Sequence, residues 1–200
     1  KPEGVYRLNV PTGGGKTLSS LRYALEHAKK YHKKRMFFVM PLLSIIEQNA
    51  QEIRKAVQDD SIILEHHSNV IDDENSDVEE LNKRELLIQS WDNPIVITTL
   101  VQLLNTMFLG KTSSVRRFAF LCNSVIVFDE VQSLPNKMLT LFNLTINFLV
   151  KKCHATVILC SATQPSFENA DHKLLSEVSD LITLPSETLK VFERVELVDK

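Results

Sequence analysis

A glycine-rich loop near the start of the chain has the residue types that bind phosphate. The sequence VPTGGGKT runs from Val10 to Thr17 and holds three of the chain's five glycines, directly before a lysine and a threonine. Glycines let the backbone turn its N–H groups inward, and a following helix adds positive potential for an anion. Lys16 would reach the β- and γ-phosphates of a nucleotide, and the Thr17 hydroxyl would ligate Mg²⁺. The sequence therefore predicts a nucleotide-binding loop at Thr12, Gly13, Gly14, Gly15, Lys16 and Thr17.

This loop departs from the full phosphate-loop pattern at one position. In the pattern G-x-x-x-x-G-K-[ST], Val10 stands where the first glycine belongs. The alternative is a glycine-rich turn that only joins a strand to a helix. The β-forming residues before the loop, and the helical spacing of Leu18, Leu21 and Leu25 after it, favour the phosphate loop.

A pair of acids supplies the second part of such a site. The segment VIVFDEVQ is an apolar strand that ends in Asp129 and Glu130. An Asp at this point would hold Mg²⁺, and the adjacent carboxylate would orient and deprotonate an attacking water. We therefore predict Lys16, Asp129 and Glu130 as catalytic residues, with Thr17 and Asp129 as metal ligands. The alternative is two solvated acids that cap the next helix.

The elements needed to position these groups alternate between strands and helices. Apolar, strand-like runs alternate with helical patterns, which predicts parallel βαβ units and an α/β fold with helices on both faces of the sheet. Strands are expected near 7–10, 35–40, 61–65, 94–99, 124–130 and 155–163. The polar signatures at Gly13–Thr17, Asp129–Gln132 and Ser161–Thr163 each follow a strand, where ligands of such sheets bind.

Composition agrees with one compact domain. The 200 residues are 44% hydrophobic and 24% charged, so a sizeable core is possible. The net charge of −2 is unlike that of a strongly basic nucleic-acid binder. It does not exclude a protein that contacts phosphates through backbone N–H groups and hydroxyls. Cys122, Cys153 and Cys160 form no metal-binding or disulfide pattern. No apolar run reaches membrane-spanning length, and we expect a cytoplasmic protein without a membrane partner.

Three motifs in this order and spacing resemble the first motor lobe of superfamily-2 helicases. VPTGGGKT is similar to their first motif, DEVQ to a variant of their D-E-x-H box, and SAT (Ser161–Thr163) to their third motif. A narrower resemblance, carried by IIEQNA, EHHSN and FDEVQSLP, is to the CRISPR-associated helicase–nuclease of type I interference systems. The resemblance spans about residues 5–163 and implies a RecA-like lobe that uses ATP and Mg²⁺.

The resemblance also implies roles for residues around the nucleotide. Gln132, Ser161 and Thr163 would couple nucleotide state to motion, and the segments near Pro41–Ser44 and Thr98–Thr99 would face the backbone of single-stranded DNA. Each of these residues also has an alternative role that is purely structural. Thr98–Thr99 would cap the helix that begins near Leu100, the Ser161 hydroxyl would satisfy a turn, and Gln132 would be a solvated residue at a helix end.

The predicted organisation is a RecA-like ATP-binding domain over 1–165 and a polar loop with a linker over 166–200. The chain begins Lys1-Pro2-Glu3, and no second motor lobe or histidine–aspartate nuclease pattern is recognised in it. We therefore expect a fragment whose partners are a second motor lobe, a nuclease domain, single-stranded DNA and the CRISPR surveillance complex. Alternatives are a lobe of another superfamily-2 motor, such as an RNA helicase or a restriction translocase, and a nucleotide-gated binding module without productive hydrolysis.

Overall fold

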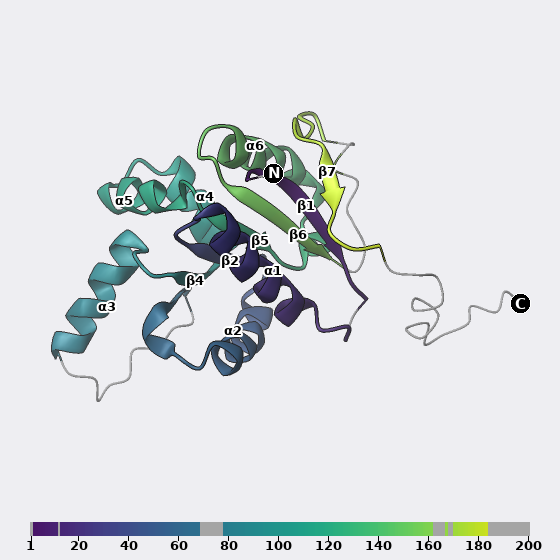
Figure 1. The fold of residues 1–200 in the computed structure, drawn as a ribbon. Coiled ribbons are helices and arrows are strands. Elements are labelled where there is room, and N and C mark those ends of the chain that lie inside the picture. Colours follow the sequence, from purple (N-terminus) through teal and green to yellow (C-terminus); the bar gives the residue numbers. More distant parts are fainter. Residues whose placement is uncertain (1, 12, 69–77, 162–166, 168–169, 184–200) are drawn as a thin grey trace, which may run out of the picture.

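The protein forms an α/β fold around one parallel sheet. The computed structural model describes residues 2–11, 13–68, 78–161, 167 and 170–183. Within them, seven strands pair in the order β3-β4-β2-β5-β6-β1-β7, and every pairing is parallel (Figure 1). The strands are β1 (Gly4–Asn9), β2 (Met36–Met40), β3 (Ile63–His66), β4 (Ile95–Thr99), β5 (Val125–Phe128), β6 (Thr156–Ser161) and β7 (Val178–Asp180). The predicted α/β class with a parallel, RecA-like sheet is confirmed.

Helices cover both faces of this sheet. The helices are α1 (Lys16–Tyr31), α2 (Leu43–Val57), α3 (Val78–Ser90), α4 (Leu100–Phe108), α5 (Thr112–Leu121) and α6 (Leu139–Lys151). One apolar core packs α1 and α2 against the sheet, and a second core packs α4 and α6, with α3 and α5 at its margin (Figure 1). The central strands are buried on both faces, as continuous apolar runs such as VIVF require.

Strand order places the predicted site residues at one edge of the sheet. β6 lies between β5 and β1, with Phe128 opposite Leu159 and Asn9 opposite Ser161. Because all three strands are parallel, the chain leaves each of them at the same edge. The glycine loop follows β1 and the acidic pair follows β5, so two segments more than a hundred residues apart in sequence meet there.

Two elements differ from the sequence prediction. Helix α5 was not expected, because its start, with Thr112, Ser113 and Ser114 after Gly110, has the composition of a loop. Strand β7 lies inside the segment 166–200, for which the sequence predicts a polar loop and linker and no strand. The strand has three residues, too few for an alternation to be seen, and it pairs with β1. The bidentate ion pair of Arg7 with Asp180, at 2.6 and 2.9 Å, joins it to the sheet.

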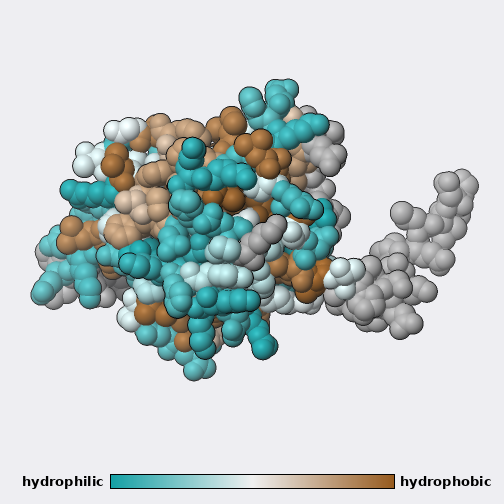
Figure 2. Space-filling view, turned by 45° about the horizontal axis from the view of Figure 1, so that its top comes forward, coloured by the Kyte–Doolittle hydropathy of each residue, from teal (hydrophilic) through white to brown (hydrophobic). Residues whose placement is uncertain are grey.

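Exposed apolar side chains gather on α4, α5 and α6. Phe108, Val115, Leu144 and Phe148 each expose more than two fifths of their surface. They line a pocket of about 510 Å³ between these helices. Figure 2 shows brown areas interrupting the hydrophilic surface on this side of the molecule. No helix in the part of the chain that the structure describes is long and apolar enough to cross a bilayer.

A half-buried histidine, His66, predicts a pH-dependent stability. His66 Nδ1 accepts a hydrogen bond of 2.9 Å from Trp91 Nε1, and burial, with Arg117 and His67 nearby, lowers the pKa of His66 to about 4. Between that pKa and the ordinary value of about 6.5, the unfolded chain binds a proton that the folded chain excludes. The contribution of His66 to stability is therefore present above about pH 6.5 and is lost as pH falls towards 4.

The variant His66→Asn tests this, because its amide oxygen still accepts from Trp91 but does not titrate. Urea titrations should show that the free energy of unfolding falls less in the variant than in the wild type between about pH 7 and pH 5. An equal fall in both proteins would show that His66 is not the responsible group.

Candidate functional site

The glycine loop adopts a conformation that requires glycine. Gly13 and Gly15 have positive φ values of 83° and 74°, in the left-handed region that other residues adopt at a cost. Gly15 immediately precedes α1, so the first helical residues are Lys16 and Thr17. Gly14 N–H donates to the Pro11 carbonyl at 3.0 Å and closes the turn. Thr12 lies outside the described residues.

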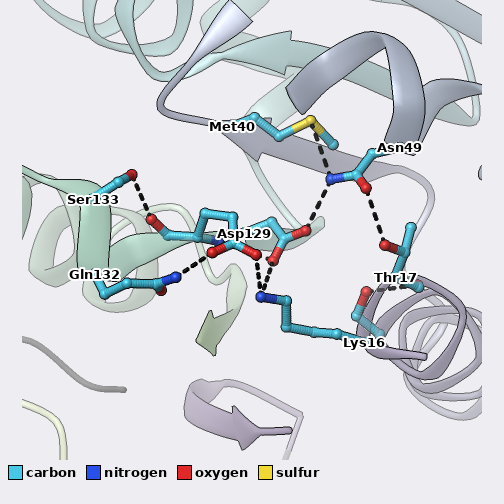
Figure 3. A network of polar contacts seen from close by, with 9 residues as sticks. Lys16, Thr17, Met40, Asn49, Asp129, Gln132 and Ser133 are labelled. Carbon is cyan, nitrogen blue, oxygen red and sulfur yellow. Dashed lines mark hydrogen bonds and ion pairs between the residues drawn. The ribbon is translucent and has the colours of Figure 1, made fainter. Parts of the chain in front are cut away.

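The structure brings the loop lysine and the acidic pair together. The Lys16 ammonium contacts a carboxylate oxygen of Glu130. It also lies 3.5 Å from Asp129 Oδ1 (Figure 3). Asp129 is only 5% exposed and follows β5, one of the most buried strands. Lys16 and the adjacent acids Asp129 and Glu130 come from two distant parts of the described chain and form a single charged cluster.

Burial makes the ionised form of Asp129 unfavourable unless positive charge lies nearby. Burial raises the pKa of the Asp129 carboxyl above its ordinary value, Lys16 offsets part of that rise, and the negative charge of Glu130 adds to it. Glu130 N–H also donates to Asp129 Oδ1 at 2.9 Å, which favours the ionised form. A cation placed beside Asp129 and Glu130 would relieve the remaining cost.

Glu130 is held in an unusual backbone conformation. Its φ and ψ angles are 52° and 40°, in the left-handed region, where a residue other than glycine is strained. One carboxylate oxygen accepts from Lys16 and the other from the side-chain amide of Gln132. The Gln132 amide is therefore engaged with the acid rather than solvated, while Gln132 Oε1 is buried without a hydrogen-bond partner. Its coupling role stays a prediction.

Asn49 belongs to the site although the sequence pattern did not single it out. Its Oδ1 accepts from Thr17 Oγ1 at 3.1 Å, and its Nδ2 donates to Asp129 Oδ2 at 3.0 Å (Figure 3). A signal was present in the sequence. Asn49 is the polar member of the buried stripe of α2, in which Ile46, Ala50 and Ile53 are apolar. A buried amide needs hydrogen-bond partners, so an asparagine in this stripe indicates that polar groups lie nearby. Here those groups are Thr17 and Asp129.

The donor set fits a hard divalent cation. Thr17 supplies a hydroxyl oxygen and Asp129 a carboxylate oxygen, and one amide touches both. Mg²⁺ prefers oxygen ligands of this kind and commonly binds through one or two protein groups plus phosphates. With Lys16 beside them, these groups can bind a phosphate–magnesium unit, and Glu130 can act on a water molecule nearby.

The residues predicted to face nucleic acid fall into two groups. Ser44 is exposed in the first turn of α2 and Pro41 is partly exposed after β2, so both remain candidates. Thr98 is fully buried and its hydroxyl donates to the His66 carbonyl at 2.7 Å. Thr99 Oγ1 accepts from the Gln102 N–H at 3.3 Å and caps α4. The capping alternative therefore describes Thr99, and the buried Thr98 side chain does not reach the surface.

The third motif is described only at its first residue. Ser161 is fully buried at the end of β6, and its carbonyl accepts from the Val10 N–H at 3.3 Å. The motif is thus joined through the backbone to the chain that enters the glycine loop. Thr163 lies outside the described residues, and both coupling roles stay predictions.

Comparison with known proteins identifies the family of this chain. The family model described as DEAD/DEAH box helicase matches residues 5–171, which is most of the chain. This match spans the glycine loop, the acidic pair and the third motif. It agrees with the superfamily-2 resemblance that those motifs carried in the sequence.

Individual relatives are distant. The chain is 27% identical over 178 residues to the CRISPR-associated nuclease/helicase Cas3 of Haloferax volcanii, covering 80% of this chain and 19% of the relative. The fold is similar to a crystal structure of T. fusca Cas3 with ADP, with a TM-score of 0.66 and 22% identity over 84% of this chain and 20% of that one. The fold is also similar to a chain of a CRISPR RNA-guided surveillance complex in a pre-nicking state. The TM-score is 0.55 and the identity is 18%, over 84% of this chain and 17% of that chain. The chain spans about one fifth of the length of these proteins.

The loop conformation yields a test with a control inside the same chain. A Cβ at Gly15 would meet no atom within 4 Å, so Gly15→Ala should destabilise the fold only through its positive φ, by roughly 1–2 kcal/mol. Gly110 has the same open surroundings without a positive φ, and Gly110→Ala should change the free energy of unfolding by less than about 0.5 kcal/mol. Urea titration of both variants measures the difference. Equal values would mean that the loop does not constrain Gly15.

Proposed function

Because the chain belongs to the DEAD/DEAH box helicase family, we propose that it is the ATP-binding lobe of an ATP-dependent DNA helicase or translocase in CRISPR antiviral defence. One observation carries the enzymatic part of this proposal, namely the meeting of Lys16, Thr17, Asp129 and Glu130 at one edge of the sheet. The distant likeness to Cas3 proteins supports the CRISPR part.

Nucleotide binding would redistribute the charges of this cluster. In the structure, Lys16 is paired with Glu130 and lies near Asp129. The β- and γ-phosphates of ATP together carry more negative charge than one carboxylate and offer the ammonium group stronger partners. Once Lys16 moves to them, the Glu130 carboxylate regains a free oxygen with which to accept a proton from the attacking water. Lys16 would thus exchange its ion pair with Glu130 for contact with the phosphates.

The cation is assigned to Thr17 and Asp129. When bound, Mg²⁺ would neutralise charge on the phosphates as it builds up in phosphoryl transfer. The protein's own contribution is to hold Lys16 and Glu130 at the same edge of the sheet, where Lys16 would bind the phosphate and Glu130 would orient the water. Gly13, Gly14 and Gly15 would bring backbone N–H groups close to the same phosphates.

We propose the remaining domains and the partners of the full-length protein from its relatives. Motors of this kind place ATP between two lobes, and an arginine from outside the phosphate site is typically worth about 10³-fold or more in rate. We therefore propose a second motor lobe and a nuclease domain elsewhere in the protein, with single-stranded DNA and a CRISPR surveillance complex as partners. Pro41 and Ser44, which follow β2, are proposed to face the DNA backbone.

Two substitutions in the full-length protein separate binding from hydrolysis. Lys16→Ala should weaken ATP binding in calorimetry by roughly 10- to 100-fold, because a charge-assisted contact to phosphate is lost. Glu130→Gln should leave ATP affinity within a few-fold of wild type and reduce the rate of hydrolysis by about 10²–10⁴-fold, because the base is removed.

Matched controls are available in the same fold. Lys30→Ala removes an exposed lysine of α1, and Glu26→Gln makes the same acid-to-amide change at an exposed position of that helix. Neither should alter binding or hydrolysis. Unchanged affinity in Lys16→Ala would refute the phosphate loop. Full activity in Glu130→Gln would favour the alternative assignment, a nucleotide-gated binding module in which Glu130 is no base.

A further comparison separates DNA motors from RNA motors. ATP hydrolysis by the full-length protein should be stimulated more by single-stranded DNA than by RNA of the same sequence. The stimulation should weaken as salt rises, since phosphate contacts release counterions. Stronger stimulation by RNA across the salt series would instead assign the lobe to an RNA helicase.

A further inference from the structure

We infer that Asn49 is a positioning residue for the cation-binding groups, which it holds by hydrogen-bonding Thr17 and Asp129 at the same time. This inference rests on the proposed function, because Thr17 and Asp129 are assigned there to the metal. It adds a residue from α2, an element that neither the glycine loop nor the acidic pair includes.

The side-chain amide of Asn49 makes both of these hydrogen bonds. Asn49 is 6% exposed, and its two polar atoms lie 3.1 Å from Thr17 Oγ1 and 3.0 Å from Asp129 Oδ2. Its Nδ2 also lies 3.8 Å from the Met40 sulfur, at the end of β2. The amide thus links the first turn of α1, the end of β2 and the end of β5 from its place on the buried face of α2.

The chemistry of the partners decides how the amide is oriented. An ionised Asp129 can only accept hydrogen bonds, so the NH₂ of Asn49 must face Asp129 and its carbonyl oxygen must face Thr17. A carbonyl oxygen is only an acceptor, and the Thr17 hydroxyl must therefore donate its hydrogen to Asn49. The lone pairs of the Thr17 oxygen are then directed away from Asn49 and are free to bind a cation.

The same amide leaves the carboxylate able to bind. Asp129 Oδ2 accepts one hydrogen bond from Asn49, while Oδ1 accepts from the Glu130 N–H. Each carboxylate oxygen has two lone-pair positions, so these bonds orient Asp129 without using all of its capacity. Groups that orient metal ligands in this way typically change metal affinity by about 10- to 100-fold when they are removed.

Measurement of nucleotide affinity with and without metal tests the inference in the full-length protein. In wild type, calorimetry gives the affinity for ADP with Mg²⁺ and with excess chelator. In Asn49→Ala the affinity for ADP with Mg²⁺ should fall by about 10- to 100-fold, while the metal-free affinity should stay within about 3-fold of wild type. Electron paramagnetic resonance with Mn²⁺ and ADP should show the same loss of bound metal.

Two further variants guard against an effect on folding. Asn49→Leu fills a similar volume without polar atoms and should reproduce the selective loss. Gln51→Ala changes an exposed residue of the same helix and should behave as wild type. A thermal unfolding curve without ligand shows whether each variant is folded, and Asn49→Leu is the deciding variant if Asn49→Ala is not.

The outcomes distinguish this inference from the function on which it rests. If wild type binds ADP but the Asn49 variants keep full Mg²⁺ dependence, the inference is overturned and the nucleotide site stands. If both affinities fall together, Asn49 has a structural role only, and the inference is again overturned. If wild type itself binds no ADP under any condition, the proposed function fails and the inference fails with it.

Discussion

The buried negative charge of Asp129 is the constraint around which this site is built. A carboxylate that is 5% exposed at the end of an apolar strand is costly unless positive charge and hydrogen-bond donors surround it. Each neighbouring segment contributes one such group, namely Lys16 from α1, Asn49 from α2 and the backbone N–H of Glu130. Lys16 and Asn49 lie on helices that pack against the sheet, so the fold itself brings these groups to Asp129.

Glu130 is a strained residue at the same edge of the sheet. Its backbone angles are left-handed, as they are at five described non-glycine residues elsewhere, but Glu130 is also a charged group of the cluster. Such angles persist only where the surrounding structure enforces them. Here the fully buried β5 and the two cores on either face of the sheet provide that support. The stability of the core is therefore what keeps Lys16 and Glu130 in contact.

Local patterns predicted the regular elements well and the marginal ones poorly. Helices such as α4 and buried strands such as β5 follow from strong periodicity and apolar runs, which depend on neighbouring residues alone. Helix α5 begins with a Thr-Ser-Ser run that is typical of a loop, which hides its start. Strand β7 is held by pairing with β1 and by the Arg7–Asp180 ion pair, which are contacts between segments distant in sequence. The same limit applies to Thr98, whose hydroxyl is occupied by the His66 carbonyl of a neighbouring strand.

The sequence by itself determined the chemical groups of the site. A lysine and a threonine after three glycines, and two acids after an apolar strand, are local patterns typical of phosphate and metal binding, and their order along the chain indicated the helicase family. Tertiary structure decided which groups meet. Strand order put β5 and β1 on either side of β6, the ion pair of Lys16 with Glu130 followed from that order, and the fold turned Asn49 towards Thr17 and Asp129. The physical reason is that hydrogen bonds and charge pairs act over a few ångströms in space, whereas a sequence pattern records only distance along the chain.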